Sequence, residues 1–172
     1  MFSVVILFIV IFCVFSAQEI IQFAIDLSYE IGYQPAMPKT PDTVKPELES
    51  LISKYESGQI SVIDLSTIKT FSWDRLLIFQ PYASPHSINP KIGRSWHTID
   101  SCIYAVGRTS NSEGYGLLVF LYGSKIVHCS LYKISDDMPY FYLTDSEIET
   151  GFSRQEALFT ISGNRLINVP RK

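Results

Sequence analysis

The N-terminal part of the chain has almost no charge. Residues 2–17 contain no Asp, Glu, Lys, Arg or His, only two serines interrupt their apolar side chains, and no lysine or arginine precedes Lys39. A cleavable signal peptide begins with a positively charged segment and ends at small residues. Here the positive segment is missing, and cleavage after Ala17 would place the bulky Phe15 where a small residue is required. An uncleaved membrane anchor is therefore favoured, with a cleaved signal as the alternative.

The helical pattern does not stop with the apolar run. Apolar residues recur at helical spacing as far as Ile31, and Gly32 and Pro35 then supply a C-cap and a stop signal. Residues 1–32 are therefore predicted to form one anchor (or signal) helix, which contacts the membrane through residues 2–25 as a single span.

Several signatures of common functions are missing. The 14 basic and 17 acidic residues give a net charge of −3, and no basic run occurs, which argues against nucleic acid as a partner. No glycine-rich phosphate loop opens a helix, and no Cys-x-x-Cys or Cys/His spacing indicates zinc. The three histidines, His86, His97 and His128, are not at metal-ligand spacing, and no calcium-loop pattern occurs. We therefore predict no metal and no cofactor.

Cysteine is scarce, and only Cys102 and Cys129 lie outside the apolar run. If the domain is exported, these two can pair, because disulfides form in oxidising compartments. Two free buried thiols are equally compatible with the sequence, so both interpretations stay open at this point.

A proline-rich segment follows the anchor. Pro35, Pro38 and Pro41 recur every three residues within residues 33–43. Proline favours extended backbone, so this segment is predicted to be a semi-rigid spacer. Residues 44–172 then form one predicted α+β domain, long enough to bury a single core.

An amphipathic helix is predicted at the start of this domain. Asp42 or Thr43 can cap it, Pro46 suits its first turn, and Gly58 ends it. Its apolar stripe should lie on a sheet. The stripe consists of Val44, Leu48, Leu51, Ile52 and Tyr55.

Short apolar runs rich in branched residues predict strands after this helix. Ser84 with Pro85 predicts a short helix that Pro90 keeps from extending. We expect residues 136–152 to be irregular. The predicted fold class is therefore α+β: an N-terminal membrane helix, then one domain with an antiparallel sheet packed by an amphipathic helix. The predicted strands are residues 60–65, 75–80, 99–106, 115–122, 125–133, 157–162 and 165–169.

A Gly-Ser pair at residues 123–124 is the clearest local signal, because two-residue turns of this type close β-hairpins. The register that it implies places Phe120 opposite Val127. Both faces of residues 115–122 are apolar, so we expect this strand to be central and covered on both sides.

Residues 71–82 have the sequence FSWDRLLIFQPY. The Trp-Asp pair, the hydrophobic strand and the Phe-x-Pro-Tyr ending resemble a motif of an uncharacterised family of bacterial membrane-anchored or lipoprotein-like exported proteins. The resemblance implies an anchored α+β domain placed outside the membrane and implies no catalytic residue. It extends over about residues 64–161 and includes Gly93 and residues 117–120, 125–132 and 152–159.

Four residues are candidates for binding. Trp73, Asp74 and Tyr82 flank the strand at residues 75–80, and Trp96 adds a second indole. Aromatic side chains at strand ends are typical of recognition surfaces. The alternative is structural: Trp73 and Tyr82 close the edge of the core, and Asp74 accepts hydrogen bonds in a turn.

One segment of the chain has residue types that suggest catalysis. His97, Asp100 and Cys102 are close enough in sequence to suggest a nucleophile and its base. In a strand over residues 99–106, however, alternation places Asp100 and Cys102 on one face and His97 on the other. We therefore predict no catalytic residue. The alternative is a small exported hydrolase that uses Cys102 or a histidine.

These features together predict a non-enzymatic binding or interaction module at the membrane. A domain on a semi-rigid spacer can reach a partner close to the bilayer, so an envelope protein or a small ligand is the expected partner. The alternative location is a secreted protein, released after signal cleavage.

Overall fold

The computed structural model describes residues 19–20, 23–24, 27–28, 42–111, 114–135 and 138–170, without the side chains of residues 94, 95 and 100. The apolar run and residues 33–41 of the proline spacer lie outside the described residues. The described residues between 19 and 28 are helical, in agreement with the sequence pattern. Within the described ranges, none of the helices has both the length and the apolar character needed to cross a bilayer.

The predicted amphipathic helix is confirmed as α2 (Val44–Glu56). Its first two N–H groups, those of Val44 and Lys45, donate to Oδ1 of Asp42 at 3.0 and 3.3 Å. Asp42 therefore supplies the acceptor that an N-terminal helical turn needs. The apolar stripe is buried at Val44, Leu48 and Ile52, and the helix packs against β1 and β4.

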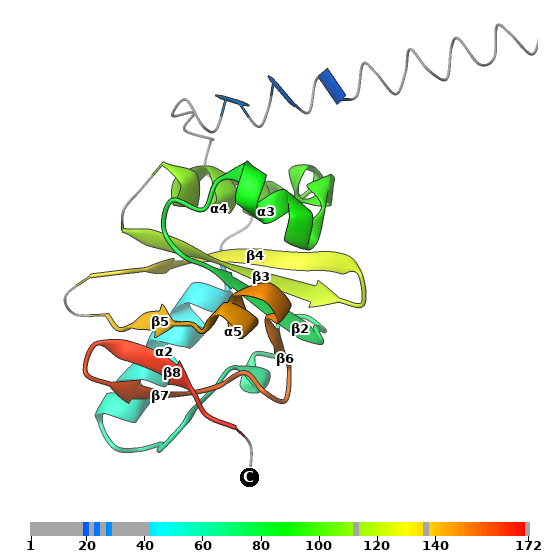
Figure 1. Cartoon of the computed structure of the whole chain (residues 1–172). Coiled ribbons are helices and arrows are strands. Elements are labelled where there is room, and N and C mark those ends of the chain that lie inside the picture. Colours follow the sequence, from blue (N-terminus) through cyan, green and yellow to red (C-terminus); the bar gives the residue numbers. More distant parts are fainter. Residues whose placement is uncertain are drawn as a thin grey trace, which may run out of the picture.

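A four-stranded antiparallel sheet, here called the central sheet, organises the domain (Figure 1). Its order is β4-β3-β2-β6, and its longest strands, β3 (Tyr115–Tyr122) and β4 (Lys125–Lys133), form the predicted hairpin. β2 (Arg75–Phe79) and β6 (Phe152–Ser153) complete it. Residues 116–121 of β3 are all buried. The expectation of a central strand covered on both sides is thus confirmed.

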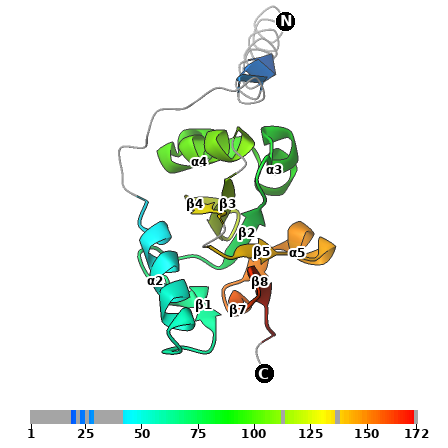
Figure 2. The same ribbon diagram turned by 90° about the vertical axis from the view of Figure 1, so that its left-hand side faces the viewer.

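Helices cover one face of the central sheet (Figure 1, Figure 2). They are α3 (Pro85–Ile92), the 3-10 helix η2 (Arg94–Thr98) and α4 (Asp100–Ser110). The short helix predicted at Pro85 is confirmed, and it ends two residues after Pro90. Between these helices and the sheet lies one core, which includes Leu77, Ile88, Trp96, Cys102, Val106, Leu117, Val119 and Cys129.

The opposite face of the central sheet is covered by α2 and by a second four-stranded sheet, here called the outer sheet (Figure 2). Its order is β1-β7-β8-β5, from β1 (Ile63–Asp64), β7 (Leu158–Ser162), β8 (Arg165–Asn168) and β5 (Tyr140–Tyr142). The core on this side includes Leu48, Ile52, Trp73, Leu118, Phe120, Phe141, Phe152 and Phe159.

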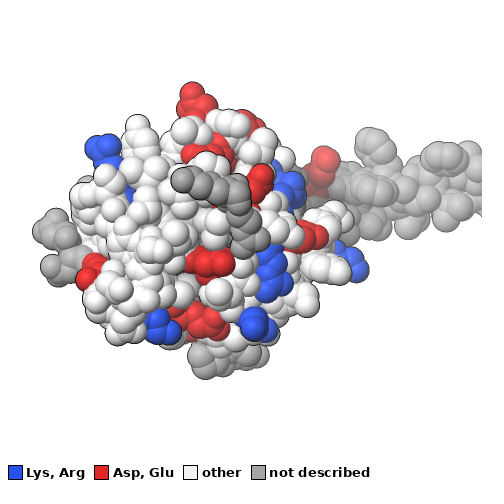
Figure 3. Space-filling model, turned by 90° about the horizontal axis from the view of Figure 1, so that it is seen from below, with Lys and Arg blue, Asp and Glu red and all other residues white. Residues whose placement is uncertain are grey.

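The C-terminal hairpin of β7 and β8 is confirmed, and β5 pairs with β8 in parallel. The strand predicted over residues 60–65 is much shorter, because β1 has only two residues before the 3-10 helix η1 (Leu65–Thr67) begins. Asp64 accepts a hydrogen bond from the Ser66 N–H and so starts this helix. Seen from below, this side of the molecule carries basic and acidic side chains interspersed with one another (Figure 3).

The predicted hairpin register is wrong beyond its first residues. Phe120 lies opposite His128 rather than Val127, because the pairing shifts between Phe120 and Leu121. An extra residue on one strand of an antiparallel pair is a β-bulge. The shift moves His128, Ser130 and Tyr132 to the face of β4 that points toward α2 and the outer sheet. Cys129 and Leu131 then point toward α4.

The strand predicted over residues 99–106 is also wrong, because these residues belong to α4. Its buried positions, Cys102, Ala105, Val106 and Thr109, follow a spacing of three and four residues, which is helical. The usual start signal is missing, because Ile99 occupies the N-cap without a side-chain hydrogen bond.

Residues 136–152 were expected to be irregular, and this expectation is wrong for part of the segment. They contain β5 and the short helix α5 (Asp145–Thr150). The Thr144 hydroxyl accepts from the Glu147 N–H at 3.3 Å, and the Glu147 carboxylate accepts from the Thr144 N–H at 2.7 Å. This reciprocal pair is a capping box, so a start signal was present in the sequence.

Tyr132 connects the two sheets. Its hydroxyl donates to Gln80 Oε1 at 3.3 Å, and Gln80 Nε2 donates to the Phe141 carbonyl in β5 at 2.6 Å. Burial raises the pKa of Tyr132 far above its ordinary value, so the hydroxyl keeps its proton. The Tyr132 ring lies directly over Gly116, its partner on β3, where a methyl group would come within 2.1 Å of the ring. This position therefore requires glycine.

We expect Gly116→Ala to destabilise the domain by about 1–3 kcal/mol, because the buried Tyr132 ring would have to move. Urea unfolding of the full-length protein in mild detergent measures the loss. Gly114→Ala is the matched control, since its added methyl meets nothing closer than the Ile134 carbonyl at 3.8 Å. Equal stabilities of the two variants would contradict this account of Gly116.

Candidate functional site

The structure does not bring the four candidate binding residues together. Trp73 is 2% exposed on the α2 side of the central sheet, and Trp96 is fully buried on the α4 side. Each indole N–H has a partner: Trp73 donates to the Ile68 carbonyl at 3.4 Å, and Trp96 donates to Asn89 Oδ1 at 2.8 Å. Both tryptophans therefore pack inside cores on opposite sides of one sheet.

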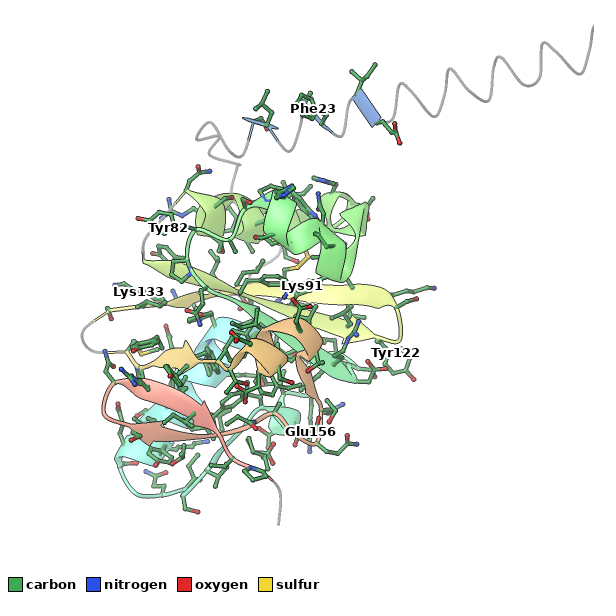
Figure 4. All side chains as sticks on the ribbon, viewed as in Figure 1. Phe23, Tyr82, Lys91, Tyr122, Lys133 and Glu156 are labelled. Carbon is green, nitrogen blue, oxygen red and sulfur yellow. A yellow bond between two sulfur atoms is a disulfide. The ribbon has the colours of Figure 1, made fainter. Side chains whose placement is uncertain are left out.

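The other two candidates lie at the surface but apart from each other. Asp74 Oδ2 accepts from the Gly123 N–H at 2.7 Å and so holds the tip of the β3–β4 hairpin. Tyr82 is 59% exposed and has a positive φ of 63°, which is uncommon for an aromatic residue. Its side chain points outward (Figure 4). Tyr122, at the tip of the β3–β4 hairpin, lies on the opposite side of the molecule. Of the four residues, only Tyr82 offers an exposed aromatic group.

Cys102 and Cys129 form a disulfide between α4 and β4. Their Cα atoms are 4.8 Å apart, and both residues are buried, with exposures of 0% and 1%. The structure thus selects the paired alternative of the two left open by the sequence. A disulfide sulfur is not a thiolate, and only a thiolate acts as a nucleophile. The His97 ring lies tilted against the Trp96 ring, with 3.5 Å between centroids, and the Asp100 side chain lies outside the described residues.

Asp42, His128 and Ser130 form a group of titratable and nucleophilic side chains. We call it the Asp42 cluster. Ser130 Oγ donates to Asp42 Oδ2 at 2.7 Å, and His128 Nε2 lies 3.4 Å from Asp42 Oδ1. The Leu131 N–H donates to Oδ2 at 3.4 Å. Together with the two helix N–H groups, these contacts surround both carboxylate oxygens and attach the start of α2 to β4.

The pKa of Asp42 is the result of opposed effects. Burial raises it, whereas the hydrogen bonds from His128, Ser130 and the Lys45 N–H, together with the charge of His128, lower it. The lowering effects are stronger, so the pKa lies below its ordinary value of 3.8 and the carboxylate is charged at neutral pH. The His128 ring stacks on Phe71 at 5.0 Å between centroids, which fixes its orientation beside Asp42.

The Asp42 cluster has the residue types of a hydrolase triad but not the geometry. In a triad the serine hydroxyl bonds to the histidine, which removes its proton. Here Ser130 donates to the aspartate and is 1% exposed, so a substrate has no access to it. The arrangement instead acts as a structural clamp. Sequence reasoning missed it, since Asp42 and His128 are 86 residues apart and the bulge decides which face His128 occupies.

The described residues contain no group of three side chains that could hold a metal ion, and Asp136 and Asp137 lie outside them. A shallow depression of about 300 Å³ lies between α2 and η1. Its lining is mixed in polarity and brings no catalytic pair together. The lining residues are Pro46, Glu47, Ser50, Leu51, Lys54 and Thr67.

Comparison with known proteins gives no relative: no family model, no curated protein and no solved structure matches the chain. The resemblance to an exported family therefore stays a prediction, and only the sequence and structure of this chain bear on its function.

We expect Asp42→Asn to cost about 1–2 kcal/mol of unfolding free energy at pH 7, because the amide N–H₂ would face the Leu131 N–H donor. The folded pKa of Asp42 is below the unfolded one, so its contribution is complete above about pH 5 and is lost as the pH falls through the folded pKa. The difference between wild type and variant should therefore shrink below pH 4. Urea unfolding at pH 7, 4 and 3 measures it.

Glu56→Gln is the control for this series, since it makes the same change of charge at an exposed position of α2. It should leave the stability nearly unchanged at each pH. An Asp42→Asn loss that is the same at pH 7 and pH 3 would contradict the role assigned to the charged carboxylate.

We expect the disulfide to stabilise the fold by about 3–4 kcal/mol, because it closes a loop of 27 residues in the unfolded chain. Reductant should lower the unfolding midpoint of the wild type and should have no effect on the Cys102→Ala/Cys129→Ala double variant. A wild-type midpoint that does not respond to reductant, with the thiols shown to be reduced, would contradict this expectation.

Proposed function

We propose that this protein is a membrane-anchored extracytoplasmic domain that works as a binding or interaction module rather than as an enzyme. In this proposal the apolar run at residues 2–17 holds the chain in the membrane. The spacer at residues 33–43 carries the domain, and the Asp42 cluster fastens its first helix to the central sheet.

The Cys102–Cys129 disulfide is the main observation that supports an extracytoplasmic location of the domain. Both cysteines outside the apolar run are used in it, and it is buried in the core between α4 and β4. Stable disulfides of this kind belong to exported proteins, because the cytosol keeps thiols reduced. An uncharged N-terminal run and a buried disulfide in the same chain support placement of the domain outside the membrane.

The helix before the spacer supports contact with the membrane. Ile20, Phe23 and Leu27 lie at helical spacing on one face, with exposures of 68%, 67% and 43%. Figure 4 shows the Phe23 side chain pointing away from its helix. Apolar side chains arranged in this way are typical of a helix whose apolar face meets lipid at the membrane surface.

A binding role is supported by the distribution of exposed aromatic residues. Tyr82, Tyr122 and Tyr142 are 59%, 59% and 48% exposed, whereas both tryptophans are buried. Tyrosine is enriched at protein interfaces because it combines a large apolar ring with a hydroxyl that tolerates water. The hydrolase alternative has no such support, because Cys102 has no free thiol and Ser130 lacks a histidine partner.

We expect an impermeant maleimide to label a Glu56→Cys variant of the full chain in intact cells, in a Cys13→Ser background. Glu56 is exposed on α2, so its reactivity reports only which side of the membrane the domain occupies. Cys102 and Cys129 should react only after reduction. Gel shifts count the labels, and the intact mass of the protein shows whether its N-terminus is uncut.

Three outcomes separate the possibilities. Labelling in intact cells and a mass that begins at Met1 support the anchored extracytoplasmic domain. A soluble form whose mass begins at Gln18 supports the secreted alternative. Labelling only after permeabilisation, with Cys102 and Cys129 reactive before reduction, overturns the extracytoplasmic placement.

A further inference from the structure

The outer sheet has one face that is turned away from the core. Its register aligns Tyr140, Arg165 and Ser162 in one row and Tyr142, Ile167 and Thr160 in the next. Tyr142, Ser162 and Arg165 are exposed, and the other three are partly exposed, so solvent reaches this face. We call these six residues the Tyr–Arg face.

Arg165 is held in position at the centre of this face. Its Nε donates to the Tyr140 hydroxyl at 2.9 Å, and its guanidinium carbon lies over the Tyr142 ring at 4.8 Å from the centroid. The first contact fixes the plane of the guanidinium, and the second is a cation–π interaction. Both partners come from β5, the strand that pairs with β8 in parallel.

Among the described residues, no carboxylate forms an ion pair with this arginine. The ion pairs formed by the described residues lie elsewhere, at Lys45, Lys91 and His128. In that part of the chain, no hydrogen bond uses the two Nη nitrogens of Arg165. Two parallel N–H donors on a fixed guanidinium match the two oxygens of a carboxylate.

We propose that the Tyr–Arg face binds an acidic segment of a partner protein, with an Asp or Glu carboxylate on the Nη edge of Arg165, beside Tyr140 and Tyr142 of β5. This inference rests on the proposed function and gives that interaction module its surface. Holding Arg165 in place before binding reduces the side-chain entropy that the complex would otherwise lose. Tyrosine and arginine are also the residue types that dominate binding energy at protein interfaces.

A protein segment fits this face better than a membrane or a nucleic acid does. Polyanionic surfaces are bound by clusters of lysine and arginine, each contributing about 1 kcal/mol. Here Arg165 is the one charged residue among the six residues of the Tyr–Arg face. A single guanidinium held by two neighbouring tyrosines can recognise one carboxylate but gives little attraction to a polyanion.

The test is photo-crosslinking of the full-length protein in its native membrane, with p-benzoylphenylalanine in place of Ser162. This position lies beside Arg165 on the face and leaves the arginine and both tyrosines intact. Matched probes at Ser124 and His86, both exposed on other elements, report on the rest of the surface. The crosslinked peptide is mapped by mass spectrometry.

We expect an adduct at position 162 whose mapped site lies within about four residues of an Asp or Glu, since an extended chain advances only about 3.4 Å per residue. Arg165→Gln should reduce its yield by about tenfold, the usual effect of losing a charged hydrogen-bonded pair. Arg75→Gln is the control, because it removes the same charge from an exposed position on β2. Thermal unfolding of both variants verifies that they fold.

An adduct at position 162 that is unaffected by Arg165→Gln, that maps to a segment without acidic residues, or that contains lipid overturns the inference. Adducts at Ser124 or His86 with none at position 162 also overturn it but leave the proposed interaction module in place. No protein adduct at any of the three positions counts against both.

Discussion

Burial of β3 on both faces is the constraint on which the rest of the structure depends. An apolar strand that forms the middle of a sheet has to be covered twice, and each cover in this protein is built from a different part of the chain. α3, η2 and α4 cover one face, while α2 and the outer sheet cover the other. The disulfide and the Asp42 cluster then attach one element of each cover to β4.

Asp42 and Arg165 are charged residues in opposite surroundings. The Asp42 carboxylate lies inward, surrounded by backbone and side-chain groups from α2 and β4, and its contacts are internal to the fold. The Arg165 guanidinium is held by Tyr140 and Tyr142, but the residue is exposed and forms no ion pair with a described carboxylate. A satisfied charge stabilises the molecule, whereas an oriented and unsatisfied charge leaves binding energy for a second molecule.

Local signals in the sequence were reliable where periodicity and turn chemistry agreed. α2, the β3–β4 hairpin, α3 and the β7–β8 hairpin follow from apolar spacing, prolines and two-residue turns. α4 was missed because a short apolar run fits either a helix or a strand, and Ile99 gives no cap to decide between them. The β-bulge was also missed, because its extra residue, Val127, is apolar like Ile126 before it and no glycine marks the position.

The candidate site was harder to predict than the fold. Trp73 and Trp96 were candidates because of their residue type. Whether such a side chain is buried depends on which segments pack against it, and both tryptophans are buried in cores. Asp42 was one of two candidate helix caps, with Thr43, but its contacts with His128 and Ser130 depend on a strand more than 80 residues away. Arg165 and the two tyrosines carry no local motif, because parallel pairing of β5 with β8 is what brings them together.

The Cys102–Cys129 crosslink also has a mechanical consequence. If the proposed anchor tethers the domain at its N-terminus, tension reaches the described part of the chain at Asp42, next to the start of α2 and in contact with β4. If tension detaches α2 and opens the central sheet, the covalent bond still excludes the 27-residue loop between the cysteines from the extending chain. At about 3.4 Å per residue, this removes roughly 90 Å from the length to which the tether can stretch. The β3 strand lies inside that loop, so the most deeply buried part of the domain is shielded from the pull.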